Sequence, residues 1–450
     1  MKKMSVPILL FLLALAVPRA QEVTAAFVNV NVIPMDRERV LEGQDVVVRG
    51  DTIISMSPTA QAPAPAGAVI VDGRGRYLIP GLAEMHAHVP GGQATEEAMA
   101  RVLFLYVANG ITTARGMLGD PRHLTLRTQV RRGEIVGPTL YTSGPSFNGN
   151  TVPTKEAAIA RVQDQKAAGY DFLKIHPGIS RDVFEALAAT AQQSGIRFAG
   201  HVPLDLGLAR ALELRFATID HIDGYVEALV RADAPLKPTD SQWFGVNLTR
   251  YADRSRIPAL VEATKKAGTW IVPTQTLFEH GQGDDDPAEM ARWPEMRYVP
   301  PQQLEQWIAG KQKFLASPDG TAENRRQFLE VRRALLKALH DGGAGIVLGS
   351  DAPQVWNVPG FSIHRELKAM VAAGLTPWQA LATGTRNVAT FFGTADRSGT
   401  VGAGMRADLV LLEGNPLADI GHTSRIAGVM VGGRWLPRAE LDTRLKGLQY

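Results

Sequence analysis

Eight short apolar segments, each separated from the next by a stretch of helical character, occupy the middle of the chain. An alternation of strand and helix is typical of a parallel sheet whose strands are joined by crossover helices. Eight strands also close a (β/α)8 barrel, which takes about 250 residues or more. We therefore predict an α/β fold with a TIM-like (β/α)8 barrel at residues 79–399, and a doubly wound open sheet is the alternative. The predicted strands are residues 78–88, 111–115, 139–143, 172–176, 198–202, 218–222, 270–273 and 346–351.

The two ends of the chain share a different pattern. Residues 23–78 alternate β-branched and polar side chains between Gly/Asp turns, and residues 405–435 return to the same pattern. Such alternation predicts antiparallel strands with one buried face. Because the two regions match, we predict one small β-sandwich assembled from residues 21–78 and 400–450.

The first 20 residues have the form of a secretory signal peptide. Lys2 and Lys3 precede an apolar run at residues 8–17, which is too short to span a bilayer. We predict cleavage after Ala20, with an uncleaved anchor as the alternative. The protein is therefore expected to be exported, either periplasmic or secreted, with no membrane segment after cleavage.

Charge and cysteine content narrow the class of partner. Removing Lys2, Lys3 and Arg19 with the signal takes the basic residues from 48 to 45, which equals the 45 acidic residues. This balance gives no electrostatic support for a nucleic-acid partner. The chain has no cysteine to form a disulfide or to carry a lipid. We therefore expect a small molecule as the partner.

Residues 278–330 are longer than the usual connection between a strand and the helix that follows it. They contain three consecutive aspartates at 284–286 and the Pro300-Pro301 pair before the pattern turns helical. We predict an insertion or lid over the barrel mouth. The aspartate run is not followed by the spacing of an EF-hand calcium loop, so a solvated loop is favoured over a calcium site.

His86 and His88 lie at the end of the first predicted barrel strand. Residues two apart on a strand point to the same side, about 6 to 7 Å apart, so both imidazoles could reach one ion. A His-X-His pair alone is a weak signal. Its position at a strand C-terminus strengthens it, because the active sites of barrel enzymes lie at that face.

Three further residues repeat this placement. His201 and His221 end the fifth and sixth predicted strands, and Asp351 ends the eighth. A buried carboxylate without a partner would be costly, so Asp351 needs a metal or a hydrogen-bond donor. Singly, each residue is more often structural than functional. Together, they supply the nitrogen and oxygen ligands that suit zinc or a similar divalent ion.

Lys174 ends the otherwise apolar fourth strand, where a charged ammonium would repel metal ions. Carboxylation by carbon dioxide would convert the amine into a carbamate, whose two oxygens could bridge ions about 3.5 to 4 Å apart. His176 has the same side orientation. For His176, a packing role is favoured over a pocket-lining role or a role as a further ligand.

These residues stand in motifs that resemble the amidohydrolase superfamily, most closely its imidazolonepropionase-like and prolidase-like branch. The resemblance covers nearly the whole mature length. The matching stretches are residues 79–82 (IPGL) before His86-Ala87-His88, 110–115 (GITTAR), 349–352 (GSDA), 402–410 (GAGMRADLV) and 414–417 (GNPL).

The resemblance implies a fold, a metal centre and a reaction. The fold would be a TIM-like barrel with a β-sandwich made from both termini. A binuclear centre, most simply two Zn2+ with Mn2+ or Co2+ as alternatives, would hydrolyse an amide, peptide or related C–N bond, with Asp351 as general base and then general acid. In such a centre His86, His88 and Asp351 would hold the first ion, His201 and His221 the second, and carboxylated Lys174 would bridge them.

The sequence departs from the prolidase-like pattern at two places. The segment before the fourth strand lacks the Gly-Gly-His element of several members, and Pro203 stands where a tyrosine often follows the fifth-strand histidine. A dipeptide with a free carboxylate is therefore not favoured, and a moderately apolar amide is expected instead. The predicted substrate contacts are Asn148, Tyr225, Gln275 and His364, because they follow barrel strands or would overhang the mouth.

Two other functions remain open at the level of sequence. A mononuclear deaminase or cyclic-amide hydrolase of the same superfamily would leave Lys174 unmodified. A catalytically silent binding protein on the same barrel would have lost a ligand. Since none of the six ligand positions is lost, the silent protein is disfavoured.

Overall fold

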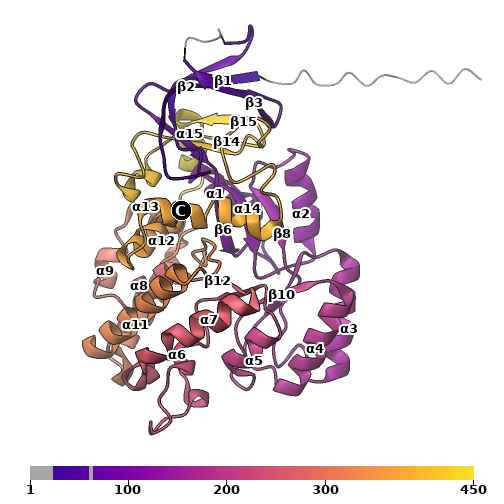
Figure 1. Ribbon diagram of the computed structural model, residues 1–450, viewed down its shortest axis with the longest axis vertical. Helices are drawn as coiled ribbons and strands as arrows, with labels where there is room; N and C mark the ends of the chain where they lie inside the picture. The colour runs from indigo at the N-terminus through magenta and orange to yellow at the C-terminus, as the bar shows by residue number, and fades with distance from the viewer. Residues whose placement is uncertain (1–23, 60–63) are drawn as a thin grey trace, which may run out of the picture.

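The computed structural model describes residues 24–59 and 64–450. The predicted signal peptide at residues 1–20 lies outside these ranges. None of the helices within the described ranges combines the length and the apolar character that a membrane span requires. A β-rich layer lies at one end of the molecule, and helices surround a group of parallel strands below it (Figure 1).

Strands from both ends of the chain form one eight-stranded sheet. Its order is β15-β14-β13-β5-β1-β2-β3, with β4 paired to β1. The indigo N-terminal strands and the yellow C-terminal strands lie together at the top of Figure 1. Side chains from both termini, among them Phe27, Leu78 and Leu411, form its core. The strands are β1 (Thr24–Val32), β2 (Leu41–Arg49), β3 (Thr52–Pro58), β4 (Val69–Asp72), β5 (Tyr77–Pro80), β13 (Leu409–Leu412), β14 (Ile426–Val431) and β15 (Arg434–Pro437).

This terminal sheet is mixed, so the expectation of antiparallel pairing throughout was wrong. β1 pairs antiparallel with β2 but parallel with both β4 and β5. β13 then pairs antiparallel with β5, which joins the two ends of the chain directly. An alternating pattern shows which face of a strand is buried, but it does not specify the direction of the neighbouring strand.

Seven of the eight predicted central strands are present, and they form two parallel groups. One group has the order β6-β7-β8 and the other has the order β12-β11-β10-β9. Most of their residues are buried, as expected for parallel strands that are covered on both faces. The strands are β6 (Leu82–Ala87), β7 (Ile111–Gly116), β8 (Thr139–Thr142), β9 (Phe172–Ile175), β10 (Arg197–Gly200), β11 (Thr218–Asp220) and β12 (Trp270–Val272).

Residues 346–351, the predicted eighth strand, make backbone contacts with both groups but form no regular strand. Val347 N donates to Ile271 O of β12 at 2.9 Å, and Met85 N of β6 donates to Leu348 O at 2.9 Å. A Cβ atom on Gly349 would lie 2.6 Å from Val272 Cγ1, so the segment approaches β12 too closely for any residue but glycine.

The two groups also adjoin on their other side. Asp171 N, just before β9, donates to Thr142 O of β8 at 2.9 Å, and Ser143 forms a parallel bridge with Phe172. The C-terminal ends of β6 to β12 and of residues 346–351 are therefore neighbours in space.

Helices follow the central strands and bury their apolar faces against them in the largest core. Their ends match local sequence signals: Thr95 and Thr154 cap the starts of α1 and α3, and Gly169 ends α3 in the left-handed conformation. The helices are α1 (Glu96–Ala108), α2 (Arg122–Arg131), α3 (Lys155–Ala168), α4 (Arg181–Ser194), α5 (Gly207–Glu213), α6 (Tyr225–Ala228), α7 (Ile257–Ala267), α8 (Gln275–Gln282), α9 (Pro287–Met290), α10 (Pro301–Leu315), α11 (Ala322–Asp341), α12 (Phe361–Ala372), α13 (Pro377–Thr383), α14 (Arg386–Phe392) and α15 (Arg438–Lys446).

The long connection at residues 278–330 is mostly helical. It contains α9, α10 and the short 3-10 helices η4 (Pro294–Tyr298) and η5 (Pro318–Gly320). Met290, Met296 and Trp307 of this segment form a separate small core with Trp356 and Val358, which follow Asp351 in the chain. Asp286 caps α9 and Asp284 pairs with Arg325 at 2.6 Å, so these two aspartates have structural partners.

Candidate metal centre

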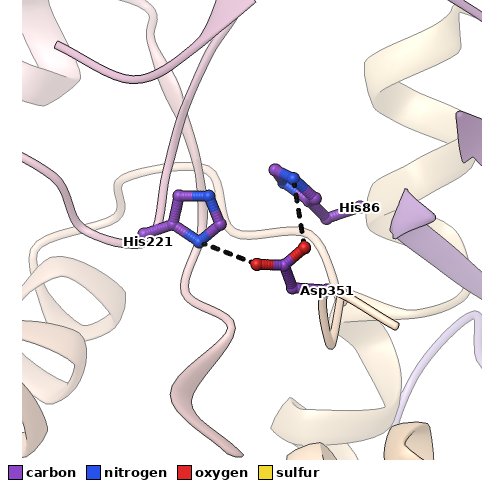
Figure 2. Close-up of side chains that lie close together, drawn as sticks. All are labelled: His86, His221 and Asp351. Carbon is purple, nitrogen blue, oxygen red and sulfur yellow. Dashed lines mark ion pairs between the residues drawn. The ribbon is translucent and has the colours of Figure 1, made fainter. Parts of the chain in front are cut away.

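Six residues predicted as ligands lie at the C-terminal ends of the central strands and come together there. His86 lies on β6 and Lys174 on β9, whereas His88, His201 and His221 each follow directly after a strand. Asp351 ends the segment 346–351, which lies beside both β12 and β6 in space. Figure 2 shows the part of this cluster formed by His86, His221 and Asp351.

Asp351 is the point where the ligand atoms converge. Its Oδ1 atom lies 2.7 Å from His88 Nε2 and 3.6 Å from His86 Nε2, and its Oδ2 atom lies 3.8 Å from His221 Nδ1. The Nζ atom of Lys174 lies 3.3 Å from His86 Nε2. His201 completes the set, with its ring centroid 4.7 Å from that of His221.

The backbone is strained at two of these residues. His221 has φ 66° and Asp351 has φ 65°, in the left-handed region that residues with a Cβ rarely adopt. Such strain persists only where the surrounding structure enforces it, and it concentrates at functional sites. His221 and Asp351, the two strained residues, are joined by one of the dashed lines in Figure 2.

The cluster has the chemistry of a divalent-cation site. Burial lowers the pKa of His86 and of His221 well below the usual value, which favours neutral imidazoles, and burial also lowers the pKa of Lys174. Within the described ranges, the buried His88 Nε2 and Asp351 Oδ1 atoms make no well-aligned hydrogen bond, although they lie 2.7 Å apart. Nitrogen and oxygen atoms that face one another in this way fit a bound divalent ion.

A second layer of residues orients the histidines. Asp220 Oδ2 lies 2.9 Å from His86 Nδ1, Asp223 Oδ2 lies 3.2 Å from His201 Nδ1, and Thr274 Oγ1 lies 2.8 Å from His221 Nδ1. Partners of this kind fix the ring orientation and the tautomer of metal-binding histidines. Sequence reasoning missed these three residues, although the Asp-His-Ile-Asp run at 220–223 was a signal that carboxylates adjoin a candidate ligand in the chain.

Asp220 is itself held by buried donors. Arg115 Nη2 donates to its Oδ1 atom at 3.2 Å, and Thr218 Oγ1 donates to the same atom at 2.6 Å. The guanidinium of Arg115 also donates to Met85 O at 2.7 Å, beside His86. The negative charge of Asp220 is therefore paired with the guanidinium of Arg115.

Glu84 connects β6 to the segment that carries Asp351. Its carboxyl accepts hydrogen bonds from Ser350 N at 2.8 Å and His86 N at 3.1 Å, and it also bonds to Ser350 Oγ. Burial raises the pKa of Glu84 to about 8. This contact holds the backbone of two candidate ligands in register.

Arg332 of α11 supports the far side of the cluster. It donates to His221 O at 2.7 Å and to Pro273 O at 3.0 Å, and its guanidinium carbon lies 3.4 Å from the ring centroid of Phe278. Burial lowers the pKa of Arg332 to about 9. The side chain thereby satisfies carbonyl groups in the irregular backbone that follows β11 and β12.

Nearby, Glu366 of α12 accepts hydrogen bonds from the backbone N–H groups of Gln275 at 2.9 Å and Thr276 at 2.6 Å. Burial raises the pKa of Glu366 to about 8. Glu366 therefore fixes the first turn of α8, which follows β12.

The four predicted substrate contacts are placed differently from the ligands. Tyr225 is fully buried with its hydroxyl 2.6 Å from Thr264 Oγ1 of α7, and His364 is buried with its Nδ1 atom 3.0 Å from Thr423 Oγ1. Both side chains are thus engaged with other elements, and contact with substrate would require them to leave these partners.

Asn148 and Gln275 also have structural partners. Asn148 Oδ1 accepts from the N–H groups of Asn150 and Thr151 within a turn. Gln275 is buried between Glu279 and Arg332. By contrast, His176, for which packing was favoured, lies half-buried with its ring 5.2 Å from that of His201, and burial lowers its pKa to about 2.

Comparison with known proteins places these features in a family. The model of the amidohydrolase family matches residues 77–436. An adenine deaminase from Ruegeria sp. is 26% identical over 208 residues, which are 42% of this chain and 33% of the deaminase. The chain thus spans about a third of the length of that relative.

Solved structures show the same fold at low identity. Bottromycin amidohydrolase is 23% identical with a TM-score of 0.71, covering 96% of this chain and 91% of its own. A Xaa-Pro dipeptidase with bound methionine in the active site is 18% identical with a TM-score of 0.67, covering 92% of this chain and 100% of its own. With the family model matched over most of its length, the chain belongs to the amidohydrolase family.

Proposed function

We propose that this protein is an exported, binuclear metal-dependent hydrolase that cleaves an amide, peptide or related C–N bond. The observation that carries the proposal is the convergence of His86, His88, Lys174, His201, His221 and Asp351 at the ends of the central strands. A family whose members act as amidohydrolases supports the reaction class. The names of two structural relatives, an amidohydrolase and a dipeptidase, favour a peptide-like amide.

The proposal includes closure of the central strands into an eight-stranded barrel, with residues 346–351 as the eighth strand. The hydrogen bonds from Val347 to Ile271 and from Met85 to Leu348 support closure between β12 and β6. We further propose residues 79–399 as the catalytic domain, residues 278–330 as an inserted lid, and residues 21–78 and 400–450 as the accessory β-domain.

In this proposal, His86, His88 and Asp351 would hold one ion, and His201 and His221 would hold the other. Lys174 would supply a carbamate ligand to both, formed when its amine adds carbon dioxide and gives up one proton to water. Zinc suits these ligands, as do manganese and cobalt. Lys174 is fully buried beside His86, which supports a role within the metal centre rather than a role at the protein surface.

When bound, divalent ions supply Lewis-acid polarisation of the scissile carbonyl and lower the pKa of a water molecule. The carboxylate of Asp351 accepts a proton from the attacking water and then donates it to the leaving nitrogen. The Asp220 and Asp223 carboxylates keep the rings of His86 and His201 oriented throughout. The substrate is proposed to be a small, moderately apolar amide.

A mononuclear deaminase is the second candidate. His86, His221 and Asp351 alone bring one ligand atom each within 4.8 Å of one another, which is enough to hold a single ion. The similarity to an adenine deaminase also favours this candidate. In that case Lys174 would stay unmodified.

Metal analysis separates the two candidates. We expect about two ions per purified chain, and we expect Lys174→Ala to lose both the second ion and activity. Lys166→Ala, which removes an exposed lysine of α3, is the matched control and should retain both. One tightly held ion together with a fully active Lys174→Ala variant would reject the bridged centre.

A hydrolysis screen tests the reaction itself. The panel consists of N-acyl amino acids, dipeptides, lactams, aryl amides and adenine, each with zinc, manganese or cobalt. Turnover of an amide supports the proposal, release of ammonia from adenine supports the deaminase, and no turnover under any metal favours a silent binding protein. Export is tested by fractionating cells that express the full chain, and retention in the cytoplasm would reject it.

A further inference from the structure

A cavity of about 480 Å³ opens on the same face of the molecule as the candidate metal centre. Its walls come from three segments: residues 242–246 after β11, residues 281–319 after β12, and Val355 and Trp356 after Asp351. Loops at this end of parallel strands form the substrate-binding face of α/β enzymes. We call it the aromatic pocket, defined by Trp243, Trp307, Phe314 and Trp356.

One aromatic side chain connects this pocket to the metal centre. Phe244 lies with its ring centroid 5.8 Å from that of His201 and 5.4 Å from that of His221. Trp243, the preceding residue, lies 5.7 Å from Phe244 in an edge-on arrangement and lines the pocket. Phe244 therefore packs between the two histidines and Trp243, the residue at the wall of the aromatic pocket.

The backbone is strained where the pocket is built. Trp243, Phe244 and Trp356 have φ values of 39°, 61° and 65°, in the region that bulky residues avoid. Trp243 is 45% exposed despite its size, although its indole packs 5.5 Å from the ring of Phe278. Strain that presents an apolar ring to an open cavity is typical of a ligand-binding surface.

Two polar groups on the walls lack partners. Within the described ranges, Trp356 Nε1 and Gln282 Oε1 are buried with no hydrogen bond, and both residues line the pocket. Leaving such atoms unpaired costs free energy. The apolar and aromatic character of the remaining walls fits an aromatic ring, which offers stacking surface for the indoles.

We propose that the aromatic pocket binds the aryl side chain of an amino-acid amide whose scissile bond lies at the metal centre. The inference rests on the proposed function for the position of the scissile bond, but binding of the ring is independent of hydrolysis. The pocket thus selects phenylalanine-like substrates over alanine-like ones.

Gly310 allows a test that does not weaken the fold. It lines the pocket within α10, and a Cβ atom built on it meets no heavy atom within 4 Å. Gly310→Leu therefore adds a side chain to the open space of the pocket, and Gly310→Ala adds a single carbon at the same position. Replacing a helical glycine also favours the helix rather than opposing it.

The experiment is calorimetric titration of the full chain with N-acetyl-L-phenylalanine amide and N-acetyl-L-alanine amide. We expect the phenylalanine amide to bind on the order of tenfold to a hundredfold more tightly, as burial of a phenyl ring predicts. Gly310→Leu and Trp243→Ala should each reduce this preference at least several-fold, and Gly310→Ala should reduce it less. Ile70→Ala, which removes an exposed apolar side chain from β4, is the control and should leave the preference unchanged.

Three results would overturn the inference. The first is a wild-type protein that binds the phenylalanine amide no more tightly than the alanine amide. The second is a preference that stays unchanged in both Gly310→Leu and Trp243→Ala. The third is a wild-type protein that elutes as a dimer on gel filtration and a Gly310→Leu variant that elutes as a monomer with an unchanged preference. That result would assign the pocket to a second copy of the chain. A preserved preference for phenylalanine with no hydrolysis under any metal would reject the proposed function and leave the pocket standing.

Discussion

The carboxylate of Asp220 lies 2.9 Å from Nδ1 of His86, and both side chains are buried. A carboxylate beside Nδ1 favours the tautomer that carries its proton there, and Nε2 then faces Asp351 and Lys174. Asp220 therefore sets which nitrogen of His86 is presented to an ion.

Replacing Asp220 should weaken metal binding without removing a ligand. We expect Asp220→Asn to lower zinc affinity about 10- to 100-fold, because an amide holds the tautomer of His86 less firmly than a carboxylate does. Competition with a chelating dye measures the change. Asp171→Asn, which alters a carboxylate paired with Arg127 away from the centre, is the control. Affinities for the two variants within twofold of each other would contradict the role of Asp220.

Removal of metal should destabilise the folded protein. An ion that binds only the native state adds about 2.7 kcal/mol when its free concentration is a hundred times its dissociation constant. We therefore expect a chelator to lower the Tm of the wild-type protein, and added zinc to restore it. Asp351→Asn should show a much smaller response, and an equal response in that variant would argue that the stabilising ion binds elsewhere.

Arg332 should be a strong determinant of stability. Arg332→Met leaves the buried carbonyls of His221 and Pro273 without their donor, so we expect a loss of about 2–5 kcal/mol in the free energy of unfolding. Arg326→Met, at an exposed position of the same helix, should change stability by only about 0.5 kcal/mol. Urea denaturation measures both, and similar values for the two variants would refute the assignment.

Glu366 should make stability depend on pH. Burial raises its pKa to about 8 in the folded protein, so between the unfolded value near 4.5 and pH 8 the native state binds a proton that the unfolded state has lost. Stability from this group is therefore lost as pH rises through that window, with a slope of at most about 1.4 kcal/mol per pH unit.

The corresponding variant removes this slope. We expect the stability of Glu366→Gln, measured by urea denaturation from pH 5 to pH 9, to fall less steeply than that of the wild-type protein. Glu305→Gln, at an exposed position of α10, should follow the wild-type curve. A Glu366→Gln curve parallel to the wild type would show that this carboxyl does not change its protonation on unfolding.

Much of the framework could be predicted from the sequence, because the signals are local. Seven of the predicted central strands are present, and the predicted ligands lie at their ends. Residues 346–351 are the exception: they contact both neighbours but form no regular strand, and Gly349 passes so close to Val272 that a Cβ atom there would lie 2.6 Å from Val272 Cγ1. That approach depends on a partner segment more than 70 positions away, which the local pattern does not contain.

The remaining differences arise from contacts between distant residues. Tyr225 follows a strand, as a substrate contact would, but its hydroxyl bonds to Thr264 on the next helix rather than to anything near Asp351. The parallel pairing of β1 with β4 and β5 likewise has no local signature. Thr274 became recognisable only when the ring of His221 was placed beside it.

Because β5 pairs with β13, the terminal sheet cannot form in full until β13 has been synthesised. Arg76, next to β5, forms an ion pair with Glu413, next to β13, and the two are 337 positions apart. The early strands therefore leave the ribosome long before their partners exist, and an edge of β5 stays open until β13 has been translated. Such an edge can recruit the strands of a neighbouring chain. A chain that stops before β13 would keep that edge permanently, so premature termination should produce aggregates rather than a smaller folded protein.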